Sequence, residues 1–316
     1  MNSTSSTAVE RALLPDALMS APGVAIVFSN ALIVAVVCGH RKLHTNTWLL
    51  LANLAVADAL VGAAFLVRSA LVLSMSQLPR GTTVFKGQCA ASFLVTVVSN
   101  RAVASLSLTV ALDRCLALCM PLFYKARLGG RRHFVVLLCL LAWADALLHT
   151  AMTGLGSSDY SQPRMASCRI VPVFYPTVMK IHQAKMMATN LSVVGLYMVQ
   201  FLVLEGRVAL EKMRRDGVVL EEEEEKTMQT RVSRTIGVIL CLFICTTFGR
   251  VFVLLLTRNV AGVSAFNRLF AFAEIPSAVS SAANLPLFMA RVAEFRRGFR
   301  KVKTPTRNLS LIATIP

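Results

Sequence analysis

Charged residues are scarce in this chain, and their scarcity excludes an ordinary soluble domain. Only 16% of the 316 residues are Asp, Glu, Lys or Arg, whereas 55% are hydrophobic, and the mean hydropathy is +0.63. Several apolar runs reach the roughly 20 residues that a membrane-crossing helix needs. We therefore expect an integral membrane protein.

Catalytic motifs are absent from the sequence as well. It contains no P-loop, no His-Glu-x-x-His and no Gly-x-Ser-x-Gly, and its five histidines form no cluster along the chain. We expect no enzymatic activity. The two halves also lack the internal repeat that many transporters show, so a small-molecule transporter is a less favoured alternative.

The amino terminus lacks the basic start and compact apolar core of a signal peptide. Residues 1–18 are expected to form a short extracellular segment. Asn2 opens an Asn-Ser-Thr sequon, which could be glycosylated if this end lies outside.

Seven apolar runs predict an all-α membrane protein with a seven-helix bundle over residues 19–290. The predicted spans are about 23–38 (starting as early as 19), 47–74, 89–118, 134–155, 178–204, 232–257 and 263–289. The fifth is the least regular, because Lys180–Lys185 is polar and is expected at or above the membrane interface.

The formal charge of +17 indicates topology rather than nucleic-acid binding. About twenty of the 33 lysines and arginines fall in segments that are cytoplasmic if the amino terminus is outside. Within residues 291–316, the segment Arg296–Lys303 is basic and amphipathic, which predicts a short eighth helix on an anionic lipid surface. We expect membrane lipids, and no nucleic acid, among the partners.

An aspartate–arginine pair stands at the end of the third predicted span. A charge at bilayer depth costs at least about 2.5 kcal/mol. With the amino terminus outside, however, Asp113 and Arg114 reach the cytoplasmic face, where they can meet water and a partner. On position alone, a pair that only fixes the depth of the helix is the favoured explanation of these residues.

The residues around this pair carry a family resemblance. The stretch LDRCLALCMPLFY, residues 112–124, resembles the Asp-Arg-Tyr segment of rhodopsin-like (class A) G-protein-coupled receptors, with Cys115 in place of the tyrosine. NLPLF, residues 284–288, resembles the seventh-helix Asn-Pro-x-x-Tyr, with Pro286 displaced by one position and Phe288 replacing the tyrosine. Trp143 fits the fourth-helix tryptophan, and EFRRGF resembles the start of the eighth helix.

The resemblance implies a role for each matching residue. For G-protein coupling it implies Asp113, Arg114, Cys115, Pro121, Arg231 and Arg234. For the activation or sodium pocket it implies Asn30, Asp58, Ser280, Ser281, Asn284, Pro286 and Phe288, with Asp58 as the metal ligand. It implies a disulfide between Cys89 and Cys168, both extracellular in this topology. No cofactor is expected beyond this sodium ion, and a protonated Asp58 bonded to Asn284 is the alternative to it.

The ligand candidates are polar residues in the outer halves of the predicted helices: Arg68, Thr96, Asn100, Arg101, Arg250 and Glu274. Thr96 occupies the position where amine receptors carry an aspartate, which argues against a biogenic amine. Three arginines against one glutamate favour an acidic small molecule or amphipathic lipid. Internal pairing of Arg250 with Glu274, and extension of Arg68 to the interface, are the structural alternatives.

Several departures from the family pattern bear on signalling. Gln229 replaces the acidic partner of Arg114, Thr246–Gly249 replaces Cys-Trp-x-Pro, and Val103 replaces a serine that would bind sodium. The resemblance leans towards the branch with melanocortin, lysophospholipid, cannabinoid, adenosine and lipid-amide receptors. It implies a plasma-membrane receptor that activates a heterotrimeric G protein, with high basal activity. A non-signalling receptor-like partner is the alternative.

Overall fold

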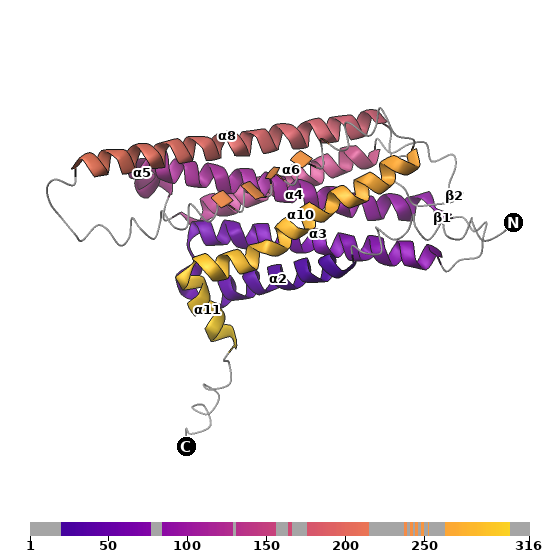
Figure 1. Cartoon of the computed structure of the whole chain (residues 1–316), viewed down its shortest axis with the longest axis horizontal. Helices are drawn as coiled ribbons and strands as arrows, with labels where there is room; N and C mark the ends of the chain where they lie inside the picture. The colour runs from indigo at the N-terminus through magenta and orange to yellow at the C-terminus, as the bar shows by residue number, and fades with distance from the viewer. Residues whose placement is uncertain are drawn as a thin grey trace, which may run out of the picture.

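The computed structural model describes residues 20–76, 84–128, 131–155, 164–165, 176–214 and 263–303, together with scattered residues between 237 and 252. Long helices run side by side through this part of the chain, and the last helix turns away from them (Figure 1). The long helices are α2 (Ser20–Gly39), α3 (Asn46–Ser76), α4 (Lys86–Cys119), α6 (Arg132–Leu155), α8 (Pro176–Arg214) and α10 (Val263–Arg291), followed by the shorter α11 (Ala293–Lys303).

The predicted spans agree with these helices to within a few residues, except that α8 continues ten residues beyond the predicted end at 204. In the described part, five segments are long and apolar enough to cross a membrane: Ser20–Gly39, Asn46–Leu71, Gly87–Cys119, Arg132–Leu155 and Ile181–Leu204. Helix α10 contains a shorter apolar segment, Ala278–Ala290. The sixth predicted span, 232–257, lies largely outside the described residues.

Helix α4 is the centre of the bundle, because α3, α6 and α8 all pack against it. Helix α2 packs on the other side of α3 and also contacts α10 and α11. Glycine allows the closest of these approaches. A Cβ atom added to Gly62 would lie 2.8 Å from the carbonyl oxygen of Gly23, so small residues are needed where α2 crosses α3.

The outer surface of α6 is apolar in the manner of a lipid-facing helix. Its exposed side chains include Leu137, Leu140, Leu141, Leu147 and Leu148. In water such a surface would be a liability, whereas lipid tails solvate it. The exposed leucines therefore show which side of α6 meets the bilayer.

The predicted eighth helix is present as α11, and aromatic packing fixes its start. Phe295 is fully buried, with its ring centroid 5.8 Å from Trp48 of α3 and 5.6 Å from Phe288 of α10. Arg297 and Arg300 are exposed on the other face. An amphipathic helix with this division suits the boundary between apolar tails and charged headgroups.

Short elements connect the long helices. The connection between α2 and α3 contains η1 (Arg41–Leu43), and the connection between α4 and α6 contains α5 (Pro121–Phe123) and η2 (Tyr124–Leu128). At the opposite end of the bundle, β1 (Val84–Phe85) pairs antiparallel with β2 (Arg164–Met165), a pairing that the sequence analysis did not predict. The pairing ties the segment before α4 to the segment after α6.

Candidate functional site

A closed group of Asp113, Arg114 and Tyr124 lies at the carboxyl-terminal end of α4. Arg114 donates from Nε and Nη2 to Asp113 Oδ2 at 3.0 and 2.5 Å, and the Tyr124 hydroxyl donates to Asp113 Oδ1 at 2.7 Å. Asp113 and Arg114 are both buried. A buried carboxylate needs such partners, since an unpaired charge away from water is costly. Arg114 is thus bonded to Asp113 of α4 and to Tyr124 of η2.

Tyr124 occupies this place because Pro121 starts a new helical turn directly after α4. Burial, followed by the nearby charge of Asp113, raises the pKa of Tyr124 to about 12. The phenol therefore stays protonated at physiological pH and remains a donor to Asp113. Sequence reasoning had given Tyr124 only as part of the matching motif, without a role.

The structure describes only some of the other residues predicted for G-protein coupling. Cys115 is half-buried, and its Sγ lies 3.7 Å from the Sγ of Cys119. Pro121 is exposed at the start of α5. Arg231, Arg234 and Gln229 lie outside the described residues.

The predicted pocket around Asp58 is present in most of its parts. Ser281 Oγ donates to Asp58 Oδ1 at 2.7 Å, and Asn284 Nδ2 donates to Asp58 Oδ2 at 2.9 Å. Asn30 Nδ2 donates to the Ser281 carbonyl at 3.2 Å, so α2, α3 and α10 meet here. Ser280 is buried but makes no hydrogen bond to Asp58. Pro286 is exposed, and Phe288 packs on Trp48 instead.

The residues at Asp58 fit a small cation only in part. The fitting groups are oxygens: the Asp58 carboxylate, the Ser281 hydroxyl, and Asn30 Oδ1, which is buried without a hydrogen-bond partner in the described part. A small cavity nearby is lined by Asn30, Asn284 and five apolar side chains, so neither Asp58 nor Ser281 faces it. Val103 is buried and supplies no oxygen.

Arg68, in the carboxyl-terminal part of α3, pairs with Glu274 of α10. The Arg68 Nη2 and Glu274 Oε2 atoms are 2.5 Å apart, and the two side chains are 7% and 0% exposed. The interpretation that Arg68 extends to the interface is therefore wrong. Glu274 finds its partner in Arg68, whereas Arg250 lies outside the described residues. Arg68 compensates the charge of Glu274 through Oε2, while Glu274 Oε1 is buried without a hydrogen-bond partner in the described part.

Thr96 and Asn100 bond to their own helix. Thr96 Oγ1 donates to the Ser92 carbonyl at 3.3 Å, and Asn100 Nδ2 donates to the Thr96 carbonyl at 3.0 Å. Each side chain thus donates one hydrogen bond within α4, while the acceptor oxygen of Asn100 and the lone pairs of the Thr96 hydroxyl remain available to a ligand.

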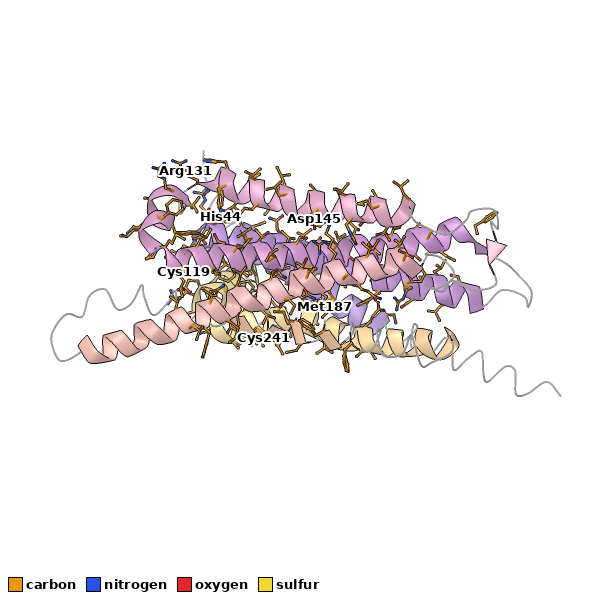
Figure 2. All side chains as sticks on the ribbon, turned by 90° about the horizontal axis from the view of Figure 1, so that it is seen from above. His44, Cys119, Arg131, Asp145, Met187 and Cys241 are labelled. Carbon is orange, nitrogen blue, oxygen red and sulfur yellow. The ribbon has the colours of Figure 1, made fainter. Side chains whose placement is uncertain are left out.

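Arg101 belongs to a polar cluster between helices that sequence reasoning missed. Its Nε donates to Asp145 Oδ2 of α6 at 2.6 Å, and its Nη1 donates to Thr189 Oγ1 of α8 at 2.8 Å. Ser105 Oγ also donates to Asp145 Oδ2, at 2.7 Å, and Lys185 Nζ donates to Asp145 Oδ1 at 2.8 Å. Figure 2 shows Asp145 between α6 and α4. We call Arg101, Asp145 and Lys185, with Ser105 and Thr189, the outer charge cluster.

Two histidines lie beside this cluster. His149 Nε2 of α6 and His182 Nδ1 of α8 are 2.6 Å apart, and the rings stack with centroids 4.9 Å apart. Lys185 and His182 belong to the polar stretch expected at or above the interface. The structure instead places both against residues well inside the outer end of α6. Asp145 could have been found from the sequence, because it is a carboxylate in the middle of a predicted span.

Comparison with known proteins decides the family. The family model for the serpentine type 7TM GPCR chemoreceptor Srsx matches residues 24–303. The chain is a rhodopsin-like G-protein-coupled receptor. Its fold is therefore the seven-helix bundle with an eighth helix, and it is a multi-pass membrane protein that transduces an extracellular ligand into G-protein signalling. Neither the transporter nor the non-signalling alternative has support.

Individual relatives agree with this assignment. Lysophosphatidic acid receptor 2 of Mus musculus is 28% identical over 291 residues, covering 88% of this receptor and 76% of the relative. Adenosine receptor A2b of Homo sapiens is 35% identical over 133 residues, covering 42% and 38%. Olfactory receptor 4K15 of Homo sapiens is 32% identical over 126 residues, covering 40% and 37%. These relatives are consistent with the predicted lean towards the lipid and adenosine branch.

Proposed function

We propose that this receptor responds to an acidic amphipathic lipid or acidic small molecule and couples through Arg114 to a heterotrimeric G protein. The observation that carries the ligand class is the charge of the outer charge cluster. Two cations, Arg101 and Lys185, share one carboxylate, Asp145. A ligand with a carboxylate or phosphate would complete this charge balance, and an apolar body would suit the surrounding helices.

The charge pattern disfavours other ligand classes. Arg68 and Glu274 neutralise each other, so they offer no net charge to a ligand. Thr96 supplies no carboxylate for an amine. The names of relatives agree with an acidic lipid, since several are lysophosphatidic acid receptors.

The proposed mechanism is a population shift at the cytoplasmic end. In the resting state, Arg114 is held by Asp113 and contacted by Tyr124. A ligand that favours an outward position of the sixth helix would open the cytoplasmic face, and Arg114 would then exchange Asp113 for the G protein. Arg231 and Arg234 are proposed to contact the same partner.

Position 229 is a glutamine where the family has an acidic residue, and this difference supports a proposal of high basal activity. In this receptor nothing on the sixth helix at that position can form a salt bridge to Arg114. Within the described residues, Arg114 is held by Asp113 and Tyr124. A gap of a few kcal/mol between the two states is small enough for such losses to change the basal population.

The topology proposed has the amino terminus outside at the plasma membrane, with Asn2 glycosylated. Cys89 and Cys168 are then both extracellular and are proposed to form a disulfide. Cys89 is buried and disulfide-bonded in the structure, and Cys168 lies outside the described residues. Pairing of Val84 with Met165 supports the proposal, because the two cysteines follow these residues by five and three positions.

Sodium binding at Asp58 is proposed on the oxygens described above. When bound, the cation would supply the positive charge that a buried carboxylate needs. Asp58, Ser281 and Asn30 would hold it. The absence of an oxygen at Val103 supports weak binding.

A ligand screen in cells tests the proposed function. Cells expressing the receptor are exposed to acidic lipids, acidic metabolites and matched neutral or amine analogues, and cyclic AMP and calcium are both recorded. Activation confined to acidic compounds is the expected result. Activation by amines alone would contradict the proposed ligand class.

A further inference from the structure

We infer that the outer charge cluster is a binding site, open to the bilayer, for the headgroup of a single-chain anionic amphiphile. The inference rests on the proposed ligand class. It adds where the anionic group binds and from which side it arrives: laterally, between α6 and α8, rather than from the extracellular solvent.

The first argument is where the cluster is exposed. The side chains of Asp145 and Lys185 are 31% and 40% exposed, whereas that of Arg101 is only 6% exposed. Around the two exposed groups the surface is apolar, with Leu141 and Leu148 of α6 and Ile181 of α8 all more than half exposed. Two ionised groups therefore open onto a surface that otherwise suits lipid tails.

Helix packing explains why this opening exists. Both α6 and α8 pack extensively on α4 but touch each other at few places (Figure 2). They are also the least covered of the five membrane-capable segments in the described part. The line along which α6 and α8 face each other, which we call the seam, is where Asp145 of α6 and Thr189 of α8 both bond Arg101 of α4.

The second argument concerns the N–H groups of Lys185 and Arg101 that donate no hydrogen bond within the described residues. Lys185 Nζ carries three N–H donors and uses one on Asp145 Oδ1. Arg101 uses Nε on Asp145 and Nη1 on Thr189 and Met186. Within the described residues, Arg101 Nη2 and the other two donors of Lys185 have no acceptor. Unmet donors on two cations at membrane depth call for an anionic oxygen acceptor.

Charge points to the same ligand. Asp145 balances one of the two cations, so the cluster carries an excess positive charge. A carboxylate or phosphate headgroup would neutralise that excess and accept from the free donors of both cations. A neutral lipid would satisfy the donors without removing the charge.

Depth selects a single-chain molecule over a bilayer phospholipid. Asp145 lies ten residues before the outer end of α6, which corresponds to about 15 Å along the helix. Lys185 lies four residues, about 6 Å, inside the membrane-capable segment that begins at Ile181. In a two-chain phospholipid the phosphate lies at the membrane interface, joined to the acyl chains on one side and to the headgroup on the other. To reach Asp145 and Lys185, this phosphate would have to move into the membrane by the distances just given. The compact head of a single-chain amphiphile can enter the seam while its chain lies along the apolar faces of α6 and α8.

Direct binding tests the inference. The full-length receptor, one copy per nanodisc of neutral phosphatidylcholine, is titrated with radiolabelled oleate and oleoyl lysophosphatidate. Saturable binding of at least one probe is expected. Lys185→Gln should weaken it about tenfold, and Lys185→Arg should retain it. Lys125→Gln is the matched control, because Lys125 is an exposed lysine outside the membrane-capable segments, and its binding should equal that of the wild type.

The other outcomes are decisive as well. Failure of both probes to saturate, or equal binding by Lys185→Gln and wild type, would overturn the inference. Competition by added phosphatidylglycerol would assign the cluster to a bilayer phospholipid and reject the single-chain ligand. Single-copy discs exclude a second receptor as the occupant.

Nucleotide exchange in the same discs separates this inference from the proposed function. An acidic amphiphile that activates wild type and Lys185→Gln equally would keep the proposed function and reject this site. Binding that is lost in Lys185→Gln, with no activation by any acidic compound, would keep the site and reject the proposed ligand class.

Discussion

Arg68 and Glu274 lie 206 residues apart in the sequence, yet they form a buried ion pair that joins α3 to α10 in the outer half of the bundle. Breaking one partner of such a pair leaves an uncompensated charge. We expect Arg68→Gln or Glu274→Gln to lower the free energy of unfolding by about 3–5 kcal/mol, whereas Arg68→Met combined with Glu274→Leu should recover much of the loss.

Thermal unfolding of purified receptor measures this effect. Arg132→Gln is the matched control, because Arg132 is exposed at the start of α6 and its loss should change the melting temperature little. If the double substitution is as unstable as the sum of the single ones, the stabilising role of the pair is packing rather than charge compensation.

Arg114→Ala should abolish receptor-catalysed nucleotide exchange while leaving surface expression nearly intact, because the proposed mechanism passes through this side chain. Exchange is measured with membranes and purified G protein, and expression by cell-surface labelling. Arg127→Ala offers a control, since Arg127 is an exposed arginine in the nearby η2. Unchanged exchange in Arg114→Ala would refute the coupling role.

Tyr124→Phe should raise basal nucleotide exchange. The substitution removes the hydrogen bond to Asp113 and the contact with Arg114, and a hydrogen bond to a charged group contributes about 1.5–3 kcal/mol. Basal exchange is compared at matched surface density. A basal rate equal to that of the wild type would show that Tyr124 does not hold the resting state.

The effect of Tyr124 should not depend on pH in the physiological range. Its folded-state pKa, about 12, is raised above the ordinary value of 10. The contribution of the protonated phenol is therefore fully present below pH 10 and is lost only as the pH rises through 12. The ratio of basal exchange between Tyr124→Phe and wild type should be the same at pH 6.5 and 8.5. A ratio that changes between these values would place a different titrating group in control.

Gln229→Glu should lower basal activity, because a carboxylate at that position could pair with Arg114 and favour the resting state. G-protein activation without ligand is recorded at graded expression density. The wild-type signal should rise with density, and the variant signal should rise less. Gln229→Asn serves as the neutral control. A flat density response that the substitution leaves unaffected would argue against basal activity.

Mass spectrometry after alkylation of surface-labelled receptor should recover Cys89 and Cys168 in one disulfide-linked peptide pair. Cys89→Ser should then release a single free thiol at Cys168. Recovery of both wild-type cysteines as alkylated thiols would contradict the proposed pairing.

The sequence by itself located the helices of the described part and predicted that Ser281 and Asn284 lie beside Asp58. Hydropathy over about 20 residues and the distribution of lysine and arginine are local signals, so they located the spans and the eighth helix without tertiary information. The family motifs likewise brought Asp58, Ser281 and Asn284 together, because each belongs to a stretch with recognisable neighbours.

Only the tertiary structure decided which charges pair. Arg68 could extend to the membrane interface or pair with Glu274. The rotation of α3 and α10 relative to each other decides between these two positions, and local hydropathy contains no information about that rotation. Arg101 gains Asp145 and Lys185 in the same way, through the packing of α6 and α8 on α4. Side chains on different helices meet according to helix rotation and crossing, and these are set by the packing of the whole bundle.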